Sequence, residues 1–408
     1  MLHSRSASHL KNHASSLFPS ASEEQLDGFL HIKYEMLDTS PISHFILRPY
    51  WRAISSRMPN FPPGILIFSG LSLTILNVVI LTFWDPAFDS HIVPAGIWLL
   101  CGVFHWVSLT CAGVDAAGRL TRREDLSQSA YLSMEYIDQA MDSVSIPIKI
   151  ICLFHLTGVN AGNTGLFSHH MAFLFFLCIL GFSLCRQWRN YKTGIFRSSA
   201  LFDGLDVGLC VGFFLKALTA IYSGYVPGDL PEWMHTILAT VILGLMLYII
   251  QTTFHLAGDV SLSDIVTNRT PVIPFILTSA LQYSWLLSPD YPAVFPYICW
   301  STTVVYSHIV SRWILNQMSD KPETQWNVMG ILVLLTGILN MCGCIPPDLR
   351  VQYAAAVCIV CTGWQTIYGI CILNALLYRV LLAVFEAFFR HAATWMVSLF
   401  GKSTKSAK

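Results

Sequence analysis

The chain has 408 residues, of which 54% are hydrophobic and only 12% are charged, and its formal net charge is zero. Its mean hydropathy of +0.55 is too apolar for an ordinary soluble protein. The neutral charge balance and the absence of a Gly-rich phosphate loop or a nucleic-acid motif also exclude a nucleic-acid partner. The composition therefore predicts an all-α, polytopic membrane protein.

Spanning a hydrocarbon core of about 30 Å takes about 20 helical residues, and about ten apolar runs of suitable length can be drawn along the chain. They run Gly64–Trp84, Ile92–Gly113, Asp142–Val159, Gly165–Cys185, Phe202–Tyr222, Trp233–Ala257, Pro271–Leu287, Pro292–Val310, Asn327–Cys344 and Gln352–Tyr378. These runs predict a transmembrane domain over residues 61–379.

Basic residues should gather on the cytoplasmic side of such a protein. They occur before the first predicted span and in alternate hairpins after it: Arg48, Arg52, Arg57, Arg119, Arg122, Arg123, Arg186, Arg189, Lys192, Arg197, Arg269, Arg312 and Lys321. The opposite hairpins offer only Arg350. Both termini are therefore predicted to be cytoplasmic.

The two ends of the chain differ in composition from the apolar middle. Residues 1–25 are rich in Ser and His and are predicted to be disordered. Residues 26–60 mix aromatic and aliphatic side chains with basic ones, which favours an interfacial amphipathic segment, although a docked structural segment fits equally well. Residues 380–408 are predicted to form a cytoplasmic C-terminal helix and tail.

An acidic stretch stands out between the second and third spans, over residues 112–142. Asp138 and Asp142 are four residues apart, so they share one helix face, with Glu135 one turn earlier. Asp115 ends the second span, which we expect to neighbour the third because the hairpin between them is short. Carboxylates from two such helix ends could hold Mg²⁺ or Mn²⁺ with phosphates. Solvated boundary charges balanced by nearby arginines would give the same pattern.

Lys149 falls two helical turns after Asp142, on the same face and inside the third span. Helical side chains lean toward the N-terminus, so its ammonium can reach back toward that carboxylate. We expect a Lys149–Asp142 ion pair, with a lysine that snorkels into a wet cavity as the alternative. Lys216 is a second intramembrane cation without an evident partner.

At these residues the chain resembles the eukaryotic CDP-alcohol phosphotransferases, in particular the ethanolamine and choline/ethanolamine phosphotransferases. The resemblance covers nearly the whole chain. It rests on the opening YEMLDTSPISHFILRPYWRAISSRMP, on TCAGVD and IDQAMDS around the acidic stretch, and on WRNYKTGI, NQMSDKPETQWN and YGI further along. It implies ten spans with a cytoplasmic active site.

The family signature, D-x2-D-G-x2-A-R-x8-or-9-G-x3-D-x3-D, is only partly kept. Aligned on AGVD, the first Asp is Ala112, the second is Asp115, and the following Gly is Ala116. The last two acids are Asp138 and Asp142. Further replacements stand at Met134 for the second Gly, at Gln139 for the His that follows the third acid, and at Gln365 in place of a His-rich stretch. The Ala-Arg pair falls on Arg119 and Leu120, or with an insertion on Gly118 and Arg122.

The resemblance implies transfer of phosphoethanolamine or phosphocholine from a CDP-alcohol to diacylglycerol, with release of CMP. It implies Asp138 and Asp142 as catalytic residues, and Asp115, Gly118 and Arg122 as nucleotide-binding residues. Asp115, Asp138 and Asp142 would bind Mg²⁺ or Mn²⁺, with Glu135 substituting for the missing acid. Family resemblance also suggests an endoplasmic reticulum or Golgi membrane.

Each departure from the signature has a physical meaning. Ala112 removes oxygen ligands from a two-metal site, and Gln139 cannot act as a general base as an imidazole can. A catalytically silent member that binds lipid or nucleotide, or pairs with an active relative, is therefore a second hypothesis; the oligomer would be a homodimer or a heterodimer. A secondary transporter using Lys149, Lys216 and the acids is a third.

Overall fold

The computed structural model describes residues 35–37, 40–57, 65–88, 93–121, 128–159, 168–193, 195–197, 200–223, 272–319 and 328–374. The predicted disordered tail, the sixth predicted span, Arg122 and the predicted C-terminal helix and tail lie outside these residues. The described chain is almost entirely helical. The prediction of an all-α, multi-pass membrane protein is confirmed.

Seven helices within the described residues are long and apolar enough to cross a membrane. Five come from the first half of the chain: α4 (Ile65–Trp84), α5 (Ala95–Thr121), α6 (Gln128–Thr157), α7 (His169–Thr193) and α8 (Ala200–Ser223). The other two are α12 (Tyr291–Ser319) and the last described helix, within Pro347–Asn374. Two shorter helices, α11 (Val272–Trp285) and α13 (Val328–Met341), fall on the seventh and ninth predicted spans.

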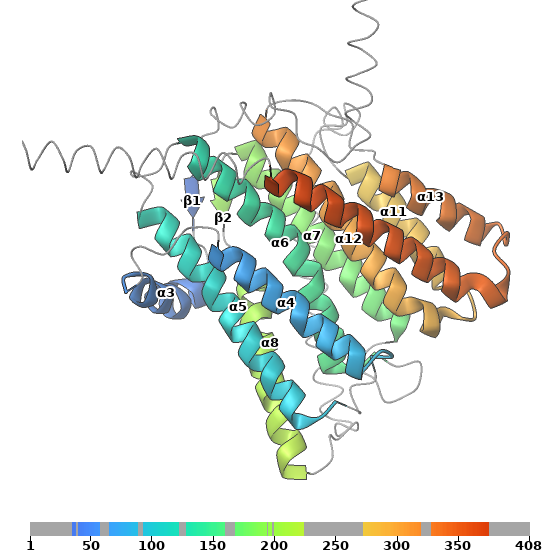
Figure 1. The fold of residues 1–408 in the computed structure, drawn as a ribbon, viewed down its shortest axis with the longest axis horizontal. Helices are drawn as coiled ribbons and strands as arrows, with labels where there is room; N and C mark the ends of the chain where they lie inside the picture. The colour runs from blue at the N-terminus through green and yellow to red at the C-terminus, as the bar shows by residue number, and fades with distance from the viewer. Residues whose placement is uncertain are drawn as a thin grey trace, which may run out of the picture.

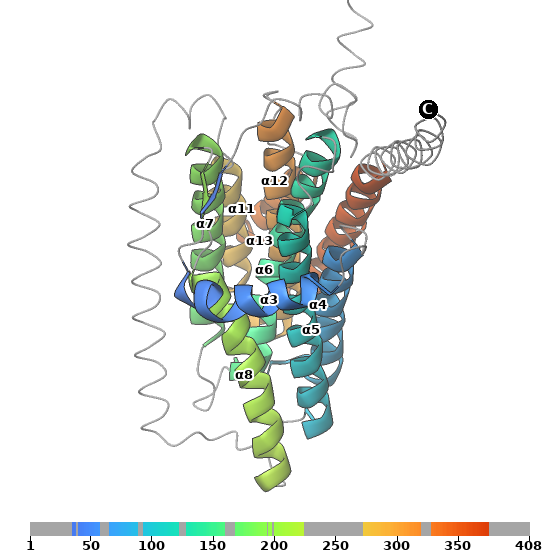
Figure 2. The same ribbon diagram turned by 90° about the vertical axis from the view of Figure 1, so that its left-hand side faces the viewer.

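Helix α6 lies in the middle of the bundle (Figures 1 and 2) and packs against α4, α7, α8 and α12. Helix α5 packs on α4 and α8, each of which also contacts α6. The second and third spans were predicted to be direct neighbours because their hairpin is short. Helices α4 and α8 each pack against both of them, and residues of both α5 and α6 line one cavity.

Helix α6 is fixed to α12 by a seam of small polar side chains. Pro147 lies inside α6 and has no N–H, so the carbonyl of Ser143 loses its usual helical donor. The hydroxyl of Ser307 donates to that carbonyl at 2.9 Å, and the Ser143 and Ser311 hydroxyls bond each other at 3.1 Å. A backbone group freed within a membrane helix is thus satisfied by its neighbour, as the apolar surroundings require.

Two short helical pieces precede the first span: a π-helical turn, η2 (Ser43–Leu47), and helix α3 (Arg48–Ser55). Helix α3 runs crosswise to the longer helices (Figure 2) and packs on α5. The Tyr50 hydroxyl lies 3.3 Å from that of Thr110. Gly113 is required in α5 because any Cβ there would run into the indole of Trp51. The assignment of residues 26–60 to the membrane interface stays a prediction.

Two three-residue strands accompany the helices. Strand β1 (Glu35–Leu37) pairs in parallel with β2 (Ile195–Arg197), with Met36 opposite Phe196. The pairing joins the segment before the first span to the connection between α7 and α8.

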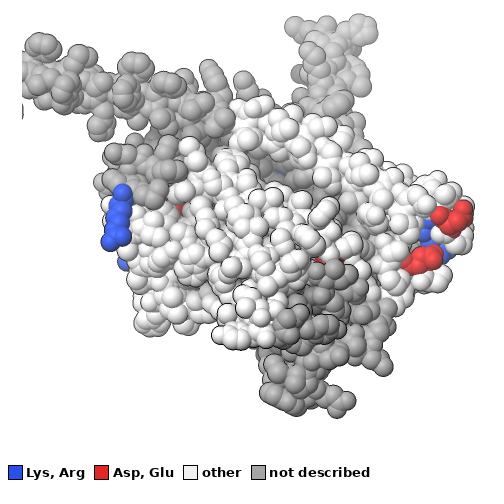
Figure 3. Space-filling model, turned by 60° about the horizontal axis from the view of Figure 1, so that its bottom comes forward, with Lys and Arg blue, Asp and Glu red and all other residues white. Residues whose placement is uncertain are grey.

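The described surface is poor in charge. On the face drawn in Figure 3, Lys, Arg, Asp and Glu atoms lie mainly toward the two sides, and most of the described area between them is uncharged. Large apolar side chains are exposed on the outward sides of several helices, for example Phe83, Leu215, Ile276 and Ile359. Such a surface is suited to contact with lipid chains rather than with water.

Candidate active site

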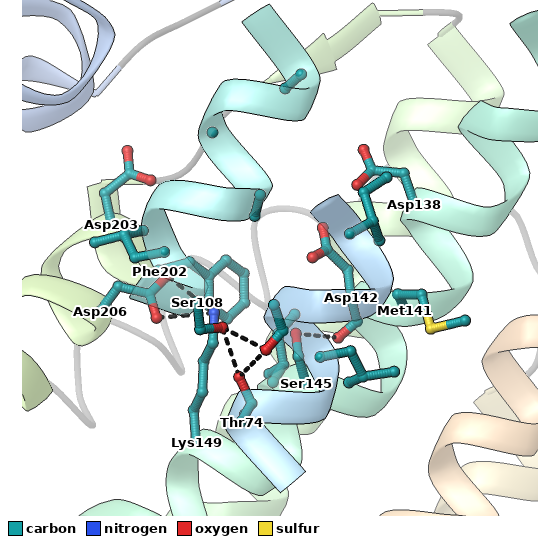
Figure 4. Close-up of a pocket in the computed structure, with 18 of the residues that line it drawn as sticks. Thr74, Ser108, Asp138, Met141, Asp142, Ser145, Lys149, Phe202, Asp203 and Asp206 are labelled. Atoms are coloured by element: carbon teal, nitrogen blue, oxygen red, sulfur yellow. Dashed lines mark hydrogen bonds and ion pairs between the residues drawn. The ribbon is translucent and has the colours of Figure 1, made fainter. Parts of the chain in front are cut away.

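Asp138 and Asp142, the two predicted catalytic residues, both line one cavity of about 250 Å³ in the described structure. They project from α6 in the same direction, as residues four apart on a helix should (Figure 4). Ala112 and Ala116 of α5 line the same cavity. The two halves of the signature therefore meet around one space, including the position where the first acid is missing.

The other predicted site residues lie elsewhere. Asp115 and Glu135 are each only 4% exposed, and neither is among the residues that line the cavity. Gly118 belongs to α5 but does not line the cavity, and Arg122 lies outside the described residues. Of the four predicted metal ligands, two therefore border the cavity.

The opposite wall contains acids that the sequence analysis did not single out. Asp203 and Asp206 stand three residues apart at the start of α8 and line the cavity across from Asp138 and Asp142 (Figure 4). The signal was present in the sequence, because Asp-Gly-Leu-Asp opens an otherwise apolar span. Acids inside a membrane span are costly unless they have partners or a function.

Asp206 holds Lys149, so the predicted Lys149–Asp142 ion pair was wrong. The Lys149 Nζ lies 2.8 Å from Asp206 Oδ1 and 3.0 Å from Oδ2, and the His105 Nε2 lies 3.3 Å from Oδ1. The three side chains come from α6, α8 and α5. The side chains of Lys149 and Asp206 are 16% and 10% exposed, so the pair is largely shielded from water. A carboxylate on a neighbouring helix is close enough to replace the partner expected within α6.

Arg186 of α7 is a second cation at this cavity. Its guanidinium carbon lies 4.8 Å from the centre of the Phe202 ring, a cation–π arrangement. Within the described residues its Nε–H has no hydrogen-bond partner. Lys149 and Arg186 attract the Asp142 carboxylate, whereas Asp138 and Asp206 repel it. The protein's own cations therefore offset part of the negative charge of the four acids that line the cavity.

Gln139 stands where the family has a histidine, and its amide is fully engaged. Its Nε2 donates to Glu135 Oε1 at 3.3 Å, and its Oε1 accepts from Gln187 Nε2 at 3.0 Å. An amide cannot take up a proton near neutral pH, so Gln139 orients α6 against α7 and offers no base.

Hydroxyl groups form the side of the cavity where α4 meets α5. The hydroxyls of Thr74 and Ser108 lie 2.8 Å apart, and Ser108 also donates to the carbonyl of Gly70 at 2.7 Å (Figure 4). Gly70 permits this approach, since a Cβ there would come within 3.0 Å of the Ser108 carbonyl oxygen. The two helices therefore close one wall of the cavity tightly.

A second, apolar cavity of about 480 Å³ lies on the other side of α6. Its walls come from α4, α6, α12 and the last described helix, and its polar groups are few. Leu71 and Met141 line both cavities. Helix α6 thus presents carboxylates to a polar space and Ile137, Val144 and Ile148 to an apolar one.

Comparison with known proteins gives several relatives, although no family model matches the chain. It is 24% identical over 339 residues to ethanolaminephosphotransferase 1 of Mus musculus, covering 78% of this chain and 82% of the relative. It is 20% identical over 373 residues to a CDP-alcohol phosphatidyltransferase class-I family protein of Schizosaccharomyces pombe, covering 85% and 91%.

A third relative is choline/ethanolaminephosphotransferase 1 of Saccharomyces cerevisiae, which is 26% identical over 226 residues, covering 54% of this chain and 52% of the relative. The similarity to the first two extends over most of both chains. The resemblance to the eukaryotic CDP-alcohol phosphotransferases that the sequence predicted is therefore confirmed.

Proposed function

We propose that this protein transfers phosphoethanolamine or phosphocholine from a CDP-alcohol to the hydroxyl of diacylglycerol, in phospholipid synthesis at the cytoplasmic face of a membrane. The observation that carries the proposal is the pair of cavities that share helix α6. A charged nucleotide donor fits the polar cavity with Asp138 and Asp142, and a lipid acceptor fits the apolar one. Met141, at the common wall, marks where the two substrates would meet.

The reaction forms one bond and breaks one. The hydroxyl oxygen of the acceptor attacks the β-phosphorus of the CDP-alcohol, and the bond from that phosphorus to the bridging oxygen breaks. CMP leaves with the electron pair of that bond. The hydroxyl proton passes to a carboxylate, and Asp142 is our first candidate because it adjoins Met141 in the chain and Gln139 cannot accept a proton. Asp138 is the alternative base.

The protein's own cations would stabilise the charge that develops on the phosphoryl oxygens. Arg48, Lys149 and Arg186 all line the polar cavity. Fixed positive charges in a site that excludes water stabilise such a transition state more than solvated charges do. A divalent cation bound with the donor would supply further charge stabilisation.

A second candidate function is a silent relative that keeps the cavities and binds nucleotide or lipid without turnover. It is favoured by Ala112 and Ala116, which line the polar cavity where the signature has Asp and Gly, and by the fixed amide of Gln139. Such a protein could act as a homodimer or in a heterodimer with an active relative. An endoplasmic reticulum or Golgi membrane is the location that the family resemblance suggests for either candidate.

The test is a reconstituted assay with the full chain in lipid vesicles. CDP-ethanolamine or CDP-choline, diacylglycerol and Mn²⁺ or Mg²⁺ are supplied, and both CMP and the labelled phospholipid are measured. Asp142→Asn should lower turnover about 100-fold or more if this carboxylate takes the proton. Asp290→Asn is the matched control, because the side chain of this acid is 39% exposed and its recorded partner is Arg350, at 3.4 Å, away from the cavity.

Equal amounts of CMP and phospholipid from the unmodified chain support the transferase. A complete lack of product with every donor and metal, while nucleotide still binds, would favour the silent relative. In that case Ala112→Asp combined with Gln139→His tests whether the missing groups restore turnover.

A further inference from the structure

The residues around the polar cavity match poorly with the divalent-metal centre that the family resemblance implies. The cavity has Ala112 where the signature has its first acid, while Asp115 and Glu135 do not line it. Among the described residues, no group of three His, Cys, Asp or Glu side chains is arranged so that it could hold a metal ion. Of the four acids that line the cavity, Asp206 holds Lys149, and Asp138, Asp142 and Asp203 are not grouped closely enough to ligate one Mg²⁺ or Mn²⁺ together.

Lys149 supplies positive charge in the same cavity, and its position is fixed. Both oxygens of Asp206 contact its Nζ. The His105 ring, which is 1% exposed, also lies against the Asp206 carboxylate. An ammonium group has three N–H donors. The two contacts to Asp206 therefore leave a donor for a ligand in the cavity that Lys149 lines.

Arg186 adds a second fixed cation on the adjoining helix. Its guanidinium is oriented by the Phe202 ring at 4.8 Å, and its Nε–H has no hydrogen-bond partner within the described residues. A planar guanidinium held in this way offers its edge N–H groups to phosphate oxygens. Lys149 and Arg186 thus both line a cavity of about 250 Å³, together with Arg48.

We propose that Lys149, held by Asp206, and Arg186 take the place of resident divalent cations and bind the diphosphate of a CDP-alcohol directly, so that nucleotide binding does not require metal. The inference rests on the proposed function for the identity of the nucleotide. It differs from the signature site, in which carboxylates hold metal ions and the metal ions hold the diphosphate. In this chain, Ala112 removes a negative charge from the cavity and Lys149 adds a positive one, so both changes shift the charge of the cavity in the same direction.

The experiment measures binding of CDP-ethanolamine to the purified full chain in lipid nanodiscs by isothermal titration calorimetry. One series contains EDTA and the other contains Mn²⁺. The dissociation constants should agree within about threefold, because the cations that contact the diphosphate belong to the protein. Lys149→Met should weaken binding in EDTA about 10- to 100-fold, the range for losing a hydrogen bond to a charged group.

Three further variants separate a binding role from a folding role. Lys216→Met is the matched control, since this lysine lies outside the cavity, near the Trp98 ring at 6.0 Å, and should leave the dissociation constant unchanged. The double variant Lys149→Met with Asp206→Asn removes both charges of the ion pair, so neither is left without its partner. It should still bind CDP-ethanolamine weakly. Ala112→Asp adds a carboxylate to the cavity and should make binding weaker in EDTA and recoverable by Mn²⁺.

The outcomes also separate this inference from the proposed reaction. Binding that vanishes in EDTA, returns with Mn²⁺ and is unaffected by Lys149→Met overturns the inference, even if the protein makes phospholipid. An absence of binding under every condition overturns it as well. Binding in EDTA that depends on Lys149, in a protein that makes no phospholipid, supports it and rejects the transferase.

Discussion

The ion pair between Lys149 and Asp206 is the feature whose energetic weight can be tested most directly. Asp206→Asn keeps the shape of the side chain but removes the carboxylate charge that both the Lys149 ammonium and the His105 ring adjoin. Removing one partner of a buried ion pair destabilises proteins by about 3–5 kcal/mol. Because Lys149 is 16% exposed at a cavity, we expect the lower end of that range, about 3 kcal/mol.

A double-mutant cycle isolates the pair from the other contacts of each residue. Lys149→Met alone leaves Asp206 with His105 only, so it should also destabilise, by about 2 kcal/mol, somewhat less than removal of the acid. The double variant strands no charge and should lie within about 1 kcal/mol of the unmodified protein. The expected coupling energy is therefore about 4–6 kcal/mol, the sum of the two single losses less the change in the double variant.

The assay is reversible equilibrium unfolding in mixed detergent micelles, followed by the fluorescence of the chain's 12 tryptophans. The matched control cycle uses Asp290→Asn and Arg350→Met, a pair at 3.4 Å whose acid is 39% exposed and whose coupling should stay below about 1 kcal/mol. A coupling energy near zero for Lys149 and Asp206, or a double variant as unstable as the two singles combined, would refute the reasoning.

Further predictions concern packing and the two cavities. Gly212→Ala should lower the melting temperature in detergent because its Cβ would collide with the Leu156 side chain, whereas Gly208→Ala on the same helix meets nothing within 4 Å and should leave it unchanged. Val144→Trp should fill part of the apolar cavity and raise the KM for diacylglycerol in the vesicle assay, with the dissociation constant for CDP-ethanolamine unchanged. Ser307→Ala should cost about 1–3 kcal/mol of unfolding free energy, measured in the same micelles, because the carbonyl freed by Pro147 loses its donor. An unchanged stability of Ser307→Ala would show that water or a lipid group satisfies that carbonyl.

The span pattern and the grouping of Asp138 with Asp142 could be predicted from the sequence because both depend on regular spacing along a helix. Long apolar runs indicate spans directly, and residues four apart must share a face. The alignment also indicated which position had lost an acid, and Ala112 does line the cavity that Asp138 and Asp142 line. Inferences of this kind need no knowledge of which helices are neighbours.

The partner of Lys149 could not be predicted in the same way. Spacing within α6 pointed to Asp142, but the choice between Asp142 and Asp206 depends on how α8 packs against α6. Two acids at the start of the fifth span were a usable sign, because an intramembrane lysine and an intramembrane acid each need a partner. The interactions of Arg186 with Phe202 and of Gln139 with Gln187 likewise depend on contacts between helices.

The serine seam between α6 and α12 has a consequence for how a donor and an acceptor would be aligned. Helix α6 lies between the polar and the apolar cavity, and its carbonyl freed by Pro147 accepts a hydrogen bond from Ser307 of α12. A hinge is therefore unnecessary for bringing phosphorus and hydroxyl together. The packing of the helices would then set the relative position of the two substrates. A change that breaks the hydrogen bond between Ser307 and the Ser143 carbonyl would displace both of them.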